Sequence, residues 1–298
     1  GRRVPSAIVV LWLPEQAEED EDENQHRRLM GQQARTTFFR AITAVEEIVS
    51  HSASEREINL SKTRRVVHSL IDHIMRDQDS LLELTAIKDF DDYTYAHSIN
   101  VSVYALTIGI HLGLDRPRLS QLGFAALFHD IGKVRLDRDL IPKPDSFAEN
   151  DWIQMQRHPI LGAKTILRTL KLDEHSVRAA LGALEHHINA DFTGYPTLRE
   201  RRPLNLFSRI ITIADTFDAL SSGRVYFKKS ISPDQVIKKM RYQMGMKFDI
   251  TLLELFNRIV GIYPVGSVVL LNTDEIAIIV AANDNQYERP HLQIIGNR

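Results

Sequence analysis

The residues of this chain most suited to chemistry are a histidine and an aspartate side by side, His129-Asp130, after the apolar run Phe124–Phe128. Adjacent residues on a helix point about 100° apart, so such a pair would not converge on one ion from mid-helix. At a helix end both side chains can turn toward one point, and Gly132 suits the turn that follows. Imidazole nitrogen and carboxylate oxygen are ligands for zinc, manganese or iron. The pair therefore predicts either a metal site or a capped helix end.

Other segments place histidine or aspartate where a ligand could stand. These residues are His97, His158, the pair His186-His187, and Asp215. His97 lies near the core face of a strongly apolar helix, where a buried structural histidine is the alternative. Asp215 lies in the nearly continuous apolar run 204–220, and an unpaired carboxylate is costly to bury there. A cation must balance it, either a metal ion or the nearby Arg209.

These segments, together with Gly194-Tyr195-Pro196, resemble in order and spacing the HD-GYP family of metal-dependent cyclic dinucleotide phosphodiesterases. The resemblance runs from about Asp89 to the C-terminus. It implies two divalent metal ions, with iron or manganese expected before zinc. It also implies two ligand sets that share one carboxylate: His97, His129, Asp130 and Asp215 for the first ion, and Asp130, His158, His186 and His187 for the second.

The chemistry implied by this resemblance is in-line hydrolysis of a phosphodiester by a hydroxide that bridges the two metal ions. Family members with a third metal carry a glutamate four residues before the first histidine, where this chain has Tyr93, so we expect two metals.

The resemblance also assigns roles in substrate binding. Asp130 and Lys133 are the expected catalytic residues, and the expected substrate contacts are Lys133, Tyr195, Arg224 and Asp218. A guanidinium fork suits the geometry of a phosphate, and a tyrosine ring can stack on a guanine base. Without the resemblance, the two cations would be ordinary surface charges and the tyrosine a plain loop aromatic.

The loop after the histidine pair departs from the family pattern at two positions. Ile188 replaces a glutamate, and Phe192 replaces a glycine. We expect Phe192 to avoid the positive φ that glycine tolerates, so that the loop sits differently from its family counterpart. Neither position is an expected metal ligand.

Composition excludes several classes of protein. The net charge of −2 provides no global basic field for duplex DNA or RNA. The absence of cysteine excludes disulfides and thiolate metal sites, which fits a cytoplasmic location. The apolar segment Ala7–Leu13 is far shorter than the roughly 20 residues that span a bilayer, and Ile99–Leu114 is typical of a buried helix, so no membrane segment is expected in this chain.

Hydrophobic periodicity predicts a predominantly α-helical fold: an HD-type helical bundle with a small C-terminal β extension, preceded by a short apolar strand at residues 4–13 and a helical region. We expect three parts. Residues 1–88 form an N-terminal region with an acidic linker at 15–25 and helices that either signal or pack on the main domain. Residues 89–262 form the catalytic helical domain, and residues 263–298 form the β extension of that domain.

The leading hypothesis is a bacterial, cytoplasmic phosphodiesterase that hydrolyses cyclic di-GMP to pGpG, GMP or both. The alternatives are an HD-type hydrolase of another cyclic dinucleotide or nucleotide, and a catalytically weak, metal-bound cyclic dinucleotide receptor or signalling scaffold. The expected partner is a cyclic dinucleotide. A signalling-protein partner and a homodimer remain open.

Overall fold

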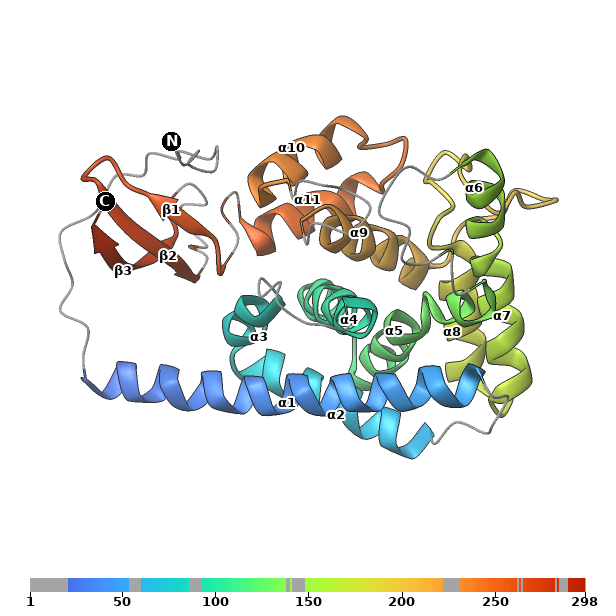
Figure 1. Ribbon diagram of the computed structural model, residues 1–298, viewed down its shortest axis with the longest axis horizontal. Helices are drawn as coiled ribbons and strands as arrows, with labels where there is room; N and C mark the ends of the chain where they lie inside the picture. Colours follow the sequence, from blue (N-terminus) through green and yellow to red (C-terminus); the bar gives the residue numbers. More distant parts are fainter. Residues whose placement is uncertain are drawn as a thin grey trace.

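The computed structural model describes residues 21–53, 60–85, 93–137, 140, 148–221, 231–261, 263, 265–281, 283 and 289–297. In this part of the chain, α-helices form a bundle with a three-stranded sheet at one end (Figure 1). The elements are α1 (Glu21–Ala53), α2 (Leu60–Arg76), α3 (Gln78–Thr85), α4 (Tyr93–His111), α5 (Arg116–Phe128), the 3-10 helix η1 (Ile131–Arg135), α6 (Glu149–Met155), α7 (His158–Thr169), α8 (Glu174–Glu185), α9 (Leu206–Ser221), α10 (Pro233–Tyr242), α11 (Ile250–Val260), β1 (Val268–Leu270), β2 (Glu275–Ala281) and β3 (His291–Asn297). The predicted fold class is confirmed, whereas the strand expected at residues 4–13 lies outside the described residues.

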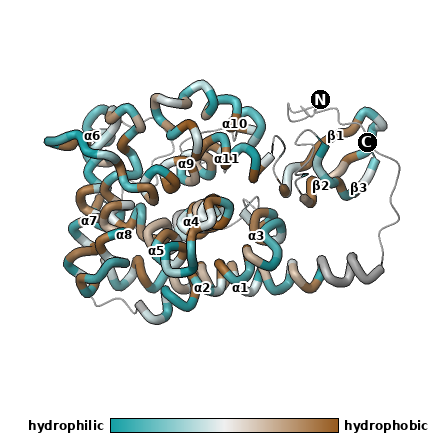
Figure 2. The backbone as a smooth tube through the Cα atoms, turned by 180° about the vertical axis from the view of Figure 1, so that it is seen from behind, coloured by the Kyte–Doolittle hydropathy of each residue, from teal (hydrophilic) through white to brown (hydrophobic). Residues whose placement is uncertain are grey.

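Helix α4 is the centre of the bundle and packs against α1, α2, α3, α5, α9 and α11 (Figure 1). Its apolar side chains face all directions and are buried, as in Ile99, Val101 and Val103. A helix that is hydrophobic all round requires neighbours on every side. Peripheral helices such as α1 and α7 instead alternate hydrophobic and hydrophilic residues, as expected for one buried face (Figure 2).

The N-terminal helix α1 runs along one side of the bundle (Figure 1) and shares its core. Phe38, Ala41 and Val45 recur at the spacing of one helix face and are buried with residues of the main bundle. The helix begins at Glu21, so the residues from 21 onward that were expected as linker are helical.

The sheet lies apart from the helical core and has a small core of its own (Figure 1). Its strands are antiparallel in the order β1-β2-β3, with Val269 opposite Ala277. Val269, Leu271, Ala277 and Ile279 form the apolar cluster beneath it. This is the predicted C-terminal β extension. No helix among the described residues is both long and apolar enough to cross a membrane.

The close approach of η1 to α7 depends on a glycine. A Cβ atom at Gly132 would lie 2.0 Å from the carbonyl oxygen of His158 and 2.4 Å from the amide nitrogen of Gly162. Both neighbours are backbone atoms, which cannot move aside as a flexible side chain would. Gly132 therefore determines how closely the segment after Asp130 approaches the start of α7.

We predict that Gly132→Ala lowers the free energy of unfolding by about 3 kcal/mol, the upper range for overpacking, because the added methyl group must displace backbone. Urea denaturation in the presence of a chelator measures the loss. Gly31→Ala is the matched control, since a Cβ there meets nothing within 4 Å. In mid-helix this control should stabilise the protein by about 0.5–1 kcal/mol. Equal unfolding free energies for Gly132→Ala and the parent would contradict the prediction.

Candidate metal centre

The residues predicted as ligands come together, and most of them lie at helix ends. His129 follows the last residue of α5, His158 is the first residue of α7, and His186 follows the last residue of α8. His97 and Asp215 project from α4 and α9. The helix end predicted at His129-Asp130 is where the structure places it.

Three of these histidines share one hydrogen-bond pattern, in which Nδ1 faces the backbone carbonyl oxygen three residues earlier. The pairs are His129 with Ala126 at 2.7 Å, His158 with Met155 at 2.7 Å, and His186 with Ala183 at 2.9 Å. Each carbonyl belongs to the last turn of a helix, where carbonyls have few intrahelical donors, and that of Ala126 also accepts from the amide of His129 at 3.4 Å. Since a carbonyl only accepts, Nδ1 carries the proton, and Nε2 presents a lone pair to the centre.

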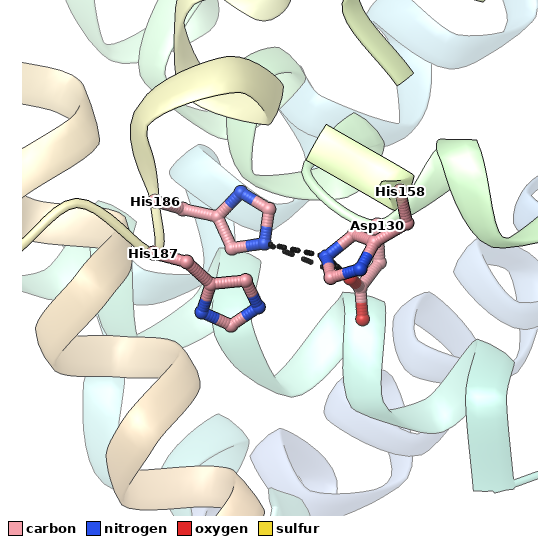
Figure 3. Close-up of side chains that lie close together, drawn as sticks. All are labelled: Asp130, His158, His186 and His187. Atoms are coloured by element: carbon pink, nitrogen blue, oxygen red, sulfur yellow. Dashed lines mark hydrogen bonds and ion pairs between the residues drawn. The ribbon is translucent and has the colours of Figure 1, made fainter. Parts of the chain in front are cut away.

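The carboxylate of Asp130 lies between two groups of histidines, with one oxygen facing each. Its Oδ2 atom is 3.7 Å from Nε2 of His97 and 3.4 Å from Nε2 of His129. Its Oδ1 atom is 3.2 Å from Nε2 of His158 and 3.7 Å from Nε2 of His186. Figure 3 shows the second group around this carboxylate.

The ligand atoms fall into two compact groups: His97, His129 and Asp215, and Asp130, His158, His186 and His187. In each group they all lie within 4.8 Å of one another. With Asp130 added to the first group, these are the two predicted ligand sets.

Each of these two groups of ligand atoms could hold a divalent cation, because the lone pairs within the group face one another. Nε2 of His158 and Nε2 of His186 are 3.2 Å apart (Figure 3), although Nδ1 of each ring faces a carbonyl. Nε2 of His129 and Oδ1 of Asp130 are buried and form no hydrogen bond with any described group. A buried lone pair without a donor is costly, and a cation between such atoms removes that cost. Nitrogen and oxygen donors without sulfur suit iron, manganese or zinc.

The electrostatics keep the donors in their metal-binding protonation states. Burial lowers the pKa of His158 to about 4, against the opposing effect of Asp130. Burial also lowers the pKa of His129 and, with His186 adding to the effect, holds that of His187 well below its usual value. Burial raises the pKa of Asp130, but Lys133 and His129 outweigh it, and the net pKa lies well below the ordinary value. Neutral imidazoles and an ionised carboxylate are the forms that bind a metal.

The structure contradicts the prediction that Asp218 binds substrate. Its side chain is fully buried, with Oδ2 2.6 Å from Nδ1 of His97 and Oδ1 accepting a hydrogen bond of 2.9 Å from Nδ2 of Asn100. A buried carboxylate engaged in this way is not available to a substrate. Asp218 instead fixes the ring of His97 so that Nε2 faces Asp215, 3.2 Å away. Sequence reasoning missed the role of Asn100. The signal that could have revealed it is the presence of a polar residue three positions after His97 on an apolar helix.

The alternative partner proposed for Asp215 does not apply. Arg209 pairs instead with Asp249, Nη1 to Oδ2, at 2.7 Å. Oδ1 of Asp215 lies 3.2 Å from Nε2 of His97 and 4.0 Å from Nε2 of His129. A metal ion held by Asp215, His97 and His129 would balance the charge of this carboxylate.

Comparison with known families agrees with this geometry. The sequence profile described as "HD domain" matches residues 68–252 of the chain, more than half of its length. The chain belongs to the HD domain family. The match begins within α2, and the boundary at residue 89 expected from the sequence stays a prediction.

Curated relatives of this HD domain protein include enzymes of cyclic dinucleotide turnover. It is 28% identical over 255 residues to the cyclic di-GMP phosphodiesterase PA4108 of Pseudomonas aeruginosa, covering 86% of this chain and 60% of that protein. It is 30% identical over 204 residues to the cyclic di-GMP phosphodiesterase response regulator RpfG of Xanthomonas campestris, covering 68% and 53%. The chain thus spans between half and two thirds of the length of these relatives.

Two further matches are a relative and a solved structure. The chain is 37% identical over 134 residues to 3'3'-cGAMP-specific phosphodiesterase 3 of Vibrio cholerae, covering 45% of this chain and 28% of that protein. The structure resembles that of Bd1817, a HDG"Y"P protein from Bdellovibrio bacteriovorus, with a TM-score of 0.59, 18% identity and 81% of each chain covered. The structural match supports the fold.

Two of the predicted substrate residues lie beside the centre of this HD domain. Lys133 forms an ion pair with Oδ2 of Asp130 and is largely buried. The ring of Tyr195 is 4.6 Å from that of His187 and 6.2 Å from that of His158, centroid to centroid. Arg224 lies outside the described residues.

The expectation for Phe192 was wrong, because this residue adopts φ +67°. The loop therefore keeps the left-handed conformation at the position where the family has glycine. Local contacts offset the strain: its amide donates to the carbonyl oxygen of Asn189 at 2.9 Å, and the guanidinium of Arg201 lies 5.7 Å from its ring centroid. Ile188, the other departure, is buried and pairs with Gly194 across the loop.

Sequence reasoning also missed Glu185, which precedes the histidine pair. Its carboxylate is fully buried, accepts from Nη2 of Arg202 at 2.6 Å, and accepts from the amide of Asn205 at 3.0 Å. These bonds join the end of α8 to the segment that leads into α9. Thr212 on α9 adds a bond to the carbonyl oxygen of His186 at 2.8 Å. The backbone that carries the two histidines is thereby held on both sides.

We predict that Asp218→Asn lowers the affinity for Mn²⁺ by about 10- to 100-fold without unfolding the protein, since it removes the carboxylate that orients His97. Titration of metal-free protein against a competing chelator measures the affinity, and circular dichroism checks the fold. Asp115→Asn is the control, because asparagine also caps a helix N-terminus and that cap belongs to α5. Unchanged Mn²⁺ affinity in a folded Asp218→Asn protein would rule out the orienting role.

Proposed function

We propose that this chain is a metal-dependent phosphodiesterase that hydrolyses cyclic di-GMP to pGpG, GMP or both in the bacterial cytoplasm. The observation that carries the proposal is the carboxylate of Asp130, which presents one oxygen to each of two groups of histidines. Two cations held on either side of one carboxylate are typical of sites that cleave phosphate esters. The relatives PA4108 and RpfG, both named cyclic di-GMP phosphodiesterases, support this substrate.

The proposed metals are two divalent ions, iron or manganese before zinc. The first would be held by His97, His129, Asp130 and Asp215, and the second by Asp130, His158, His186 and His187. When bound, such ions supply Lewis-acid stabilisation of a phosphoryl group and an activated water. The donors are imidazole nitrogens and carboxylate oxygens only, because the chain has no cysteine.

The side chains around the centre would bind and orient the substrate. Lys133 contacts Oδ2 of Asp130 in this structure, and its ammonium would donate to a phosphate oxygen once a metal ion neutralises the carboxylate. Arg224 is proposed as the second cation for the substrate phosphates. Tyr195, beside His187, would lie against the nucleoside part of the substrate. Asp218 and the carbonyls of three helix ends would keep the imidazoles aimed at the centre.

The hybrid dinucleotide 3'3'-cGAMP is a second candidate substrate. The relative named as specific for 3'3'-cGAMP is 37% identical over its shorter match of 134 residues, a higher identity than that of either cyclic di-GMP relative described above. The metal centre would serve both substrates, because the scissile bonds are alike. Any preference must come from contacts to the bases.

The receptor alternative loses part of its basis in this structure. It rested on the altered loop and on the N-terminal helix, and Phe192 nevertheless adopts a positive φ, which glycine tolerates. A signalling-protein partner and a homodimer remain predictions.

We predict that Mn²⁺-loaded protein converts cyclic di-GMP to pGpG or GMP, and that Asp130→Ala lowers turnover by about 10²- to 10³-fold or more, because the shared carboxylate is lost. Chromatography of the products measures both, with 3'3'-cGAMP assayed in parallel. Glu174→Ala, at an exposed carboxylate on α8, is the matched control and should retain turnover. Intact substrate in a sample whose metal content is verified, or full turnover by Asp130→Ala, would refute the proposal.

A further inference from the structure

Helix α6 presents two large apolar side chains to solvent beside the metal centre. Trp152 is 45% exposed and its neighbour Ile153 is 55% exposed. The helix is short, ends at Met155, and is joined to the centre because the carbonyl of that residue faces Nδ1 of His158 at 2.7 Å. Exposed apolar surface next to a predicted site is a feature of ligand-binding grooves.

A chain of aromatic contacts links Trp152 to the centre. Its ring centroid is 5.9 Å from that of Tyr195, with the two planes at 80°. Tyr195 in turn is 4.6 Å from His187 and 6.2 Å from His158. The ring of Tyr195 therefore lies between the indole of Trp152 and two proposed metal ligands.

We propose that Trp152 and Tyr195 form a subsite for a purine base of the nucleotide substrate, with Trp152 as a substrate-binding residue. The inference rests on the proposed function and adds a base-binding element to it. Two aromatic planes near a right angle make a corner in which a flat base can stack on one ring and meet the other with its edge. In a nucleotide, one sugar separates the base from the phosphate. In this structure, one ring, that of Tyr195, separates Trp152 from the proposed metal ligands, so a base beside Trp152 would leave its phosphate near the metal centre.

The chemistry of the corner favours a base over other occupants. Stacking of a base on an aromatic side chain contributes about 1–3 kcal/mol and tolerates any base with a π face. Both proposed substrates contain purines, so this subsite would strengthen binding without choosing strongly between them. The alternative role for Trp152 is structural, as a prop for the loop that carries Tyr195.

Steady-state kinetics with cyclic di-GMP separate these roles. We expect Trp152→Ala to raise KM by about 10- to 100-fold with kcat nearly unchanged, and Trp152→Phe to recover most of the loss, since a smaller ring still stacks. Ile153→Ala, on the same exposed helix, is the matched control and should behave as the parent. An unchanged KM in Trp152→Ala, or a lower kcat that Phe does not rescue, would overturn the subsite while leaving the hydrolytic function intact.

A binding measurement tests the subsite independently of turnover. The chain has two tryptophans, so Trp12→Phe leaves Trp152 as the only reporter. We expect cyclic di-GMP added to this metal-free protein to quench the fluorescence of Trp152 saturably, and calorimetry to show weaker binding by Trp152→Ala. Quenching and weakened binding would support the subsite even if no product formed in the hydrolysis assay. Equal affinity of Trp152→Ala and parent would refute it whether or not the enzyme turns over.

Discussion

The carboxylate of Asp130 is buried between imidazoles whose nitrogen lone pairs face it. The helix ends around this carboxylate are placed so that they hold the imidazoles in that orientation. A buried negative charge requires compensation, and Lys133, within η1, supplies one positive charge. The histidines contribute no compensation as neutral rings, and burial lowers the pKa of His129, His158 and His187. A cation between the carboxylate and each group of histidines would bind the nitrogen lone pairs and balance the charge of the carboxylate.

Helix ends are how this fold aims so many imidazoles at one carboxylate. A histidine at the end of a helix can donate its Nδ1 proton to a carbonyl of the last turn, where intrahelical donors are few. In His129, His158 and His186 that bond spans three residues and leaves Nε2 facing the centre. The same bond therefore caps a helix and orients a ligand. His97, which projects from within α4, lacks a free last-turn carbonyl, and the carboxylate of Asp218 takes that role.

Much of this was predictable from the sequence because helix ends leave local signals. The break after the apolar run to Phe128 and the Pro159 that follows His158 both mark places where a side chain can leave the helical periodicity. The role of Asp218 was not predictable, since Asp215 and Asp218 lie on one face of α9 and either could have served as the ligand. The positive φ of Phe192 was equally hidden, because the contacts that offset its strain come from Asn189 and from Arg201, nine residues later.

The central claim is that two metal ions lie on opposite sides of the Asp130 carboxylate. Anomalous diffraction from crystals of the Mn²⁺-loaded protein, measured at the manganese absorption edge, tests this claim most directly. We expect two peaks per chain, one beside Oδ2 of Asp130 with His97, His129 and Asp215, and one beside Oδ1 with His158, His186 and His187. A single peak, or a pair of peaks of which only one contacts Asp130, would contradict it.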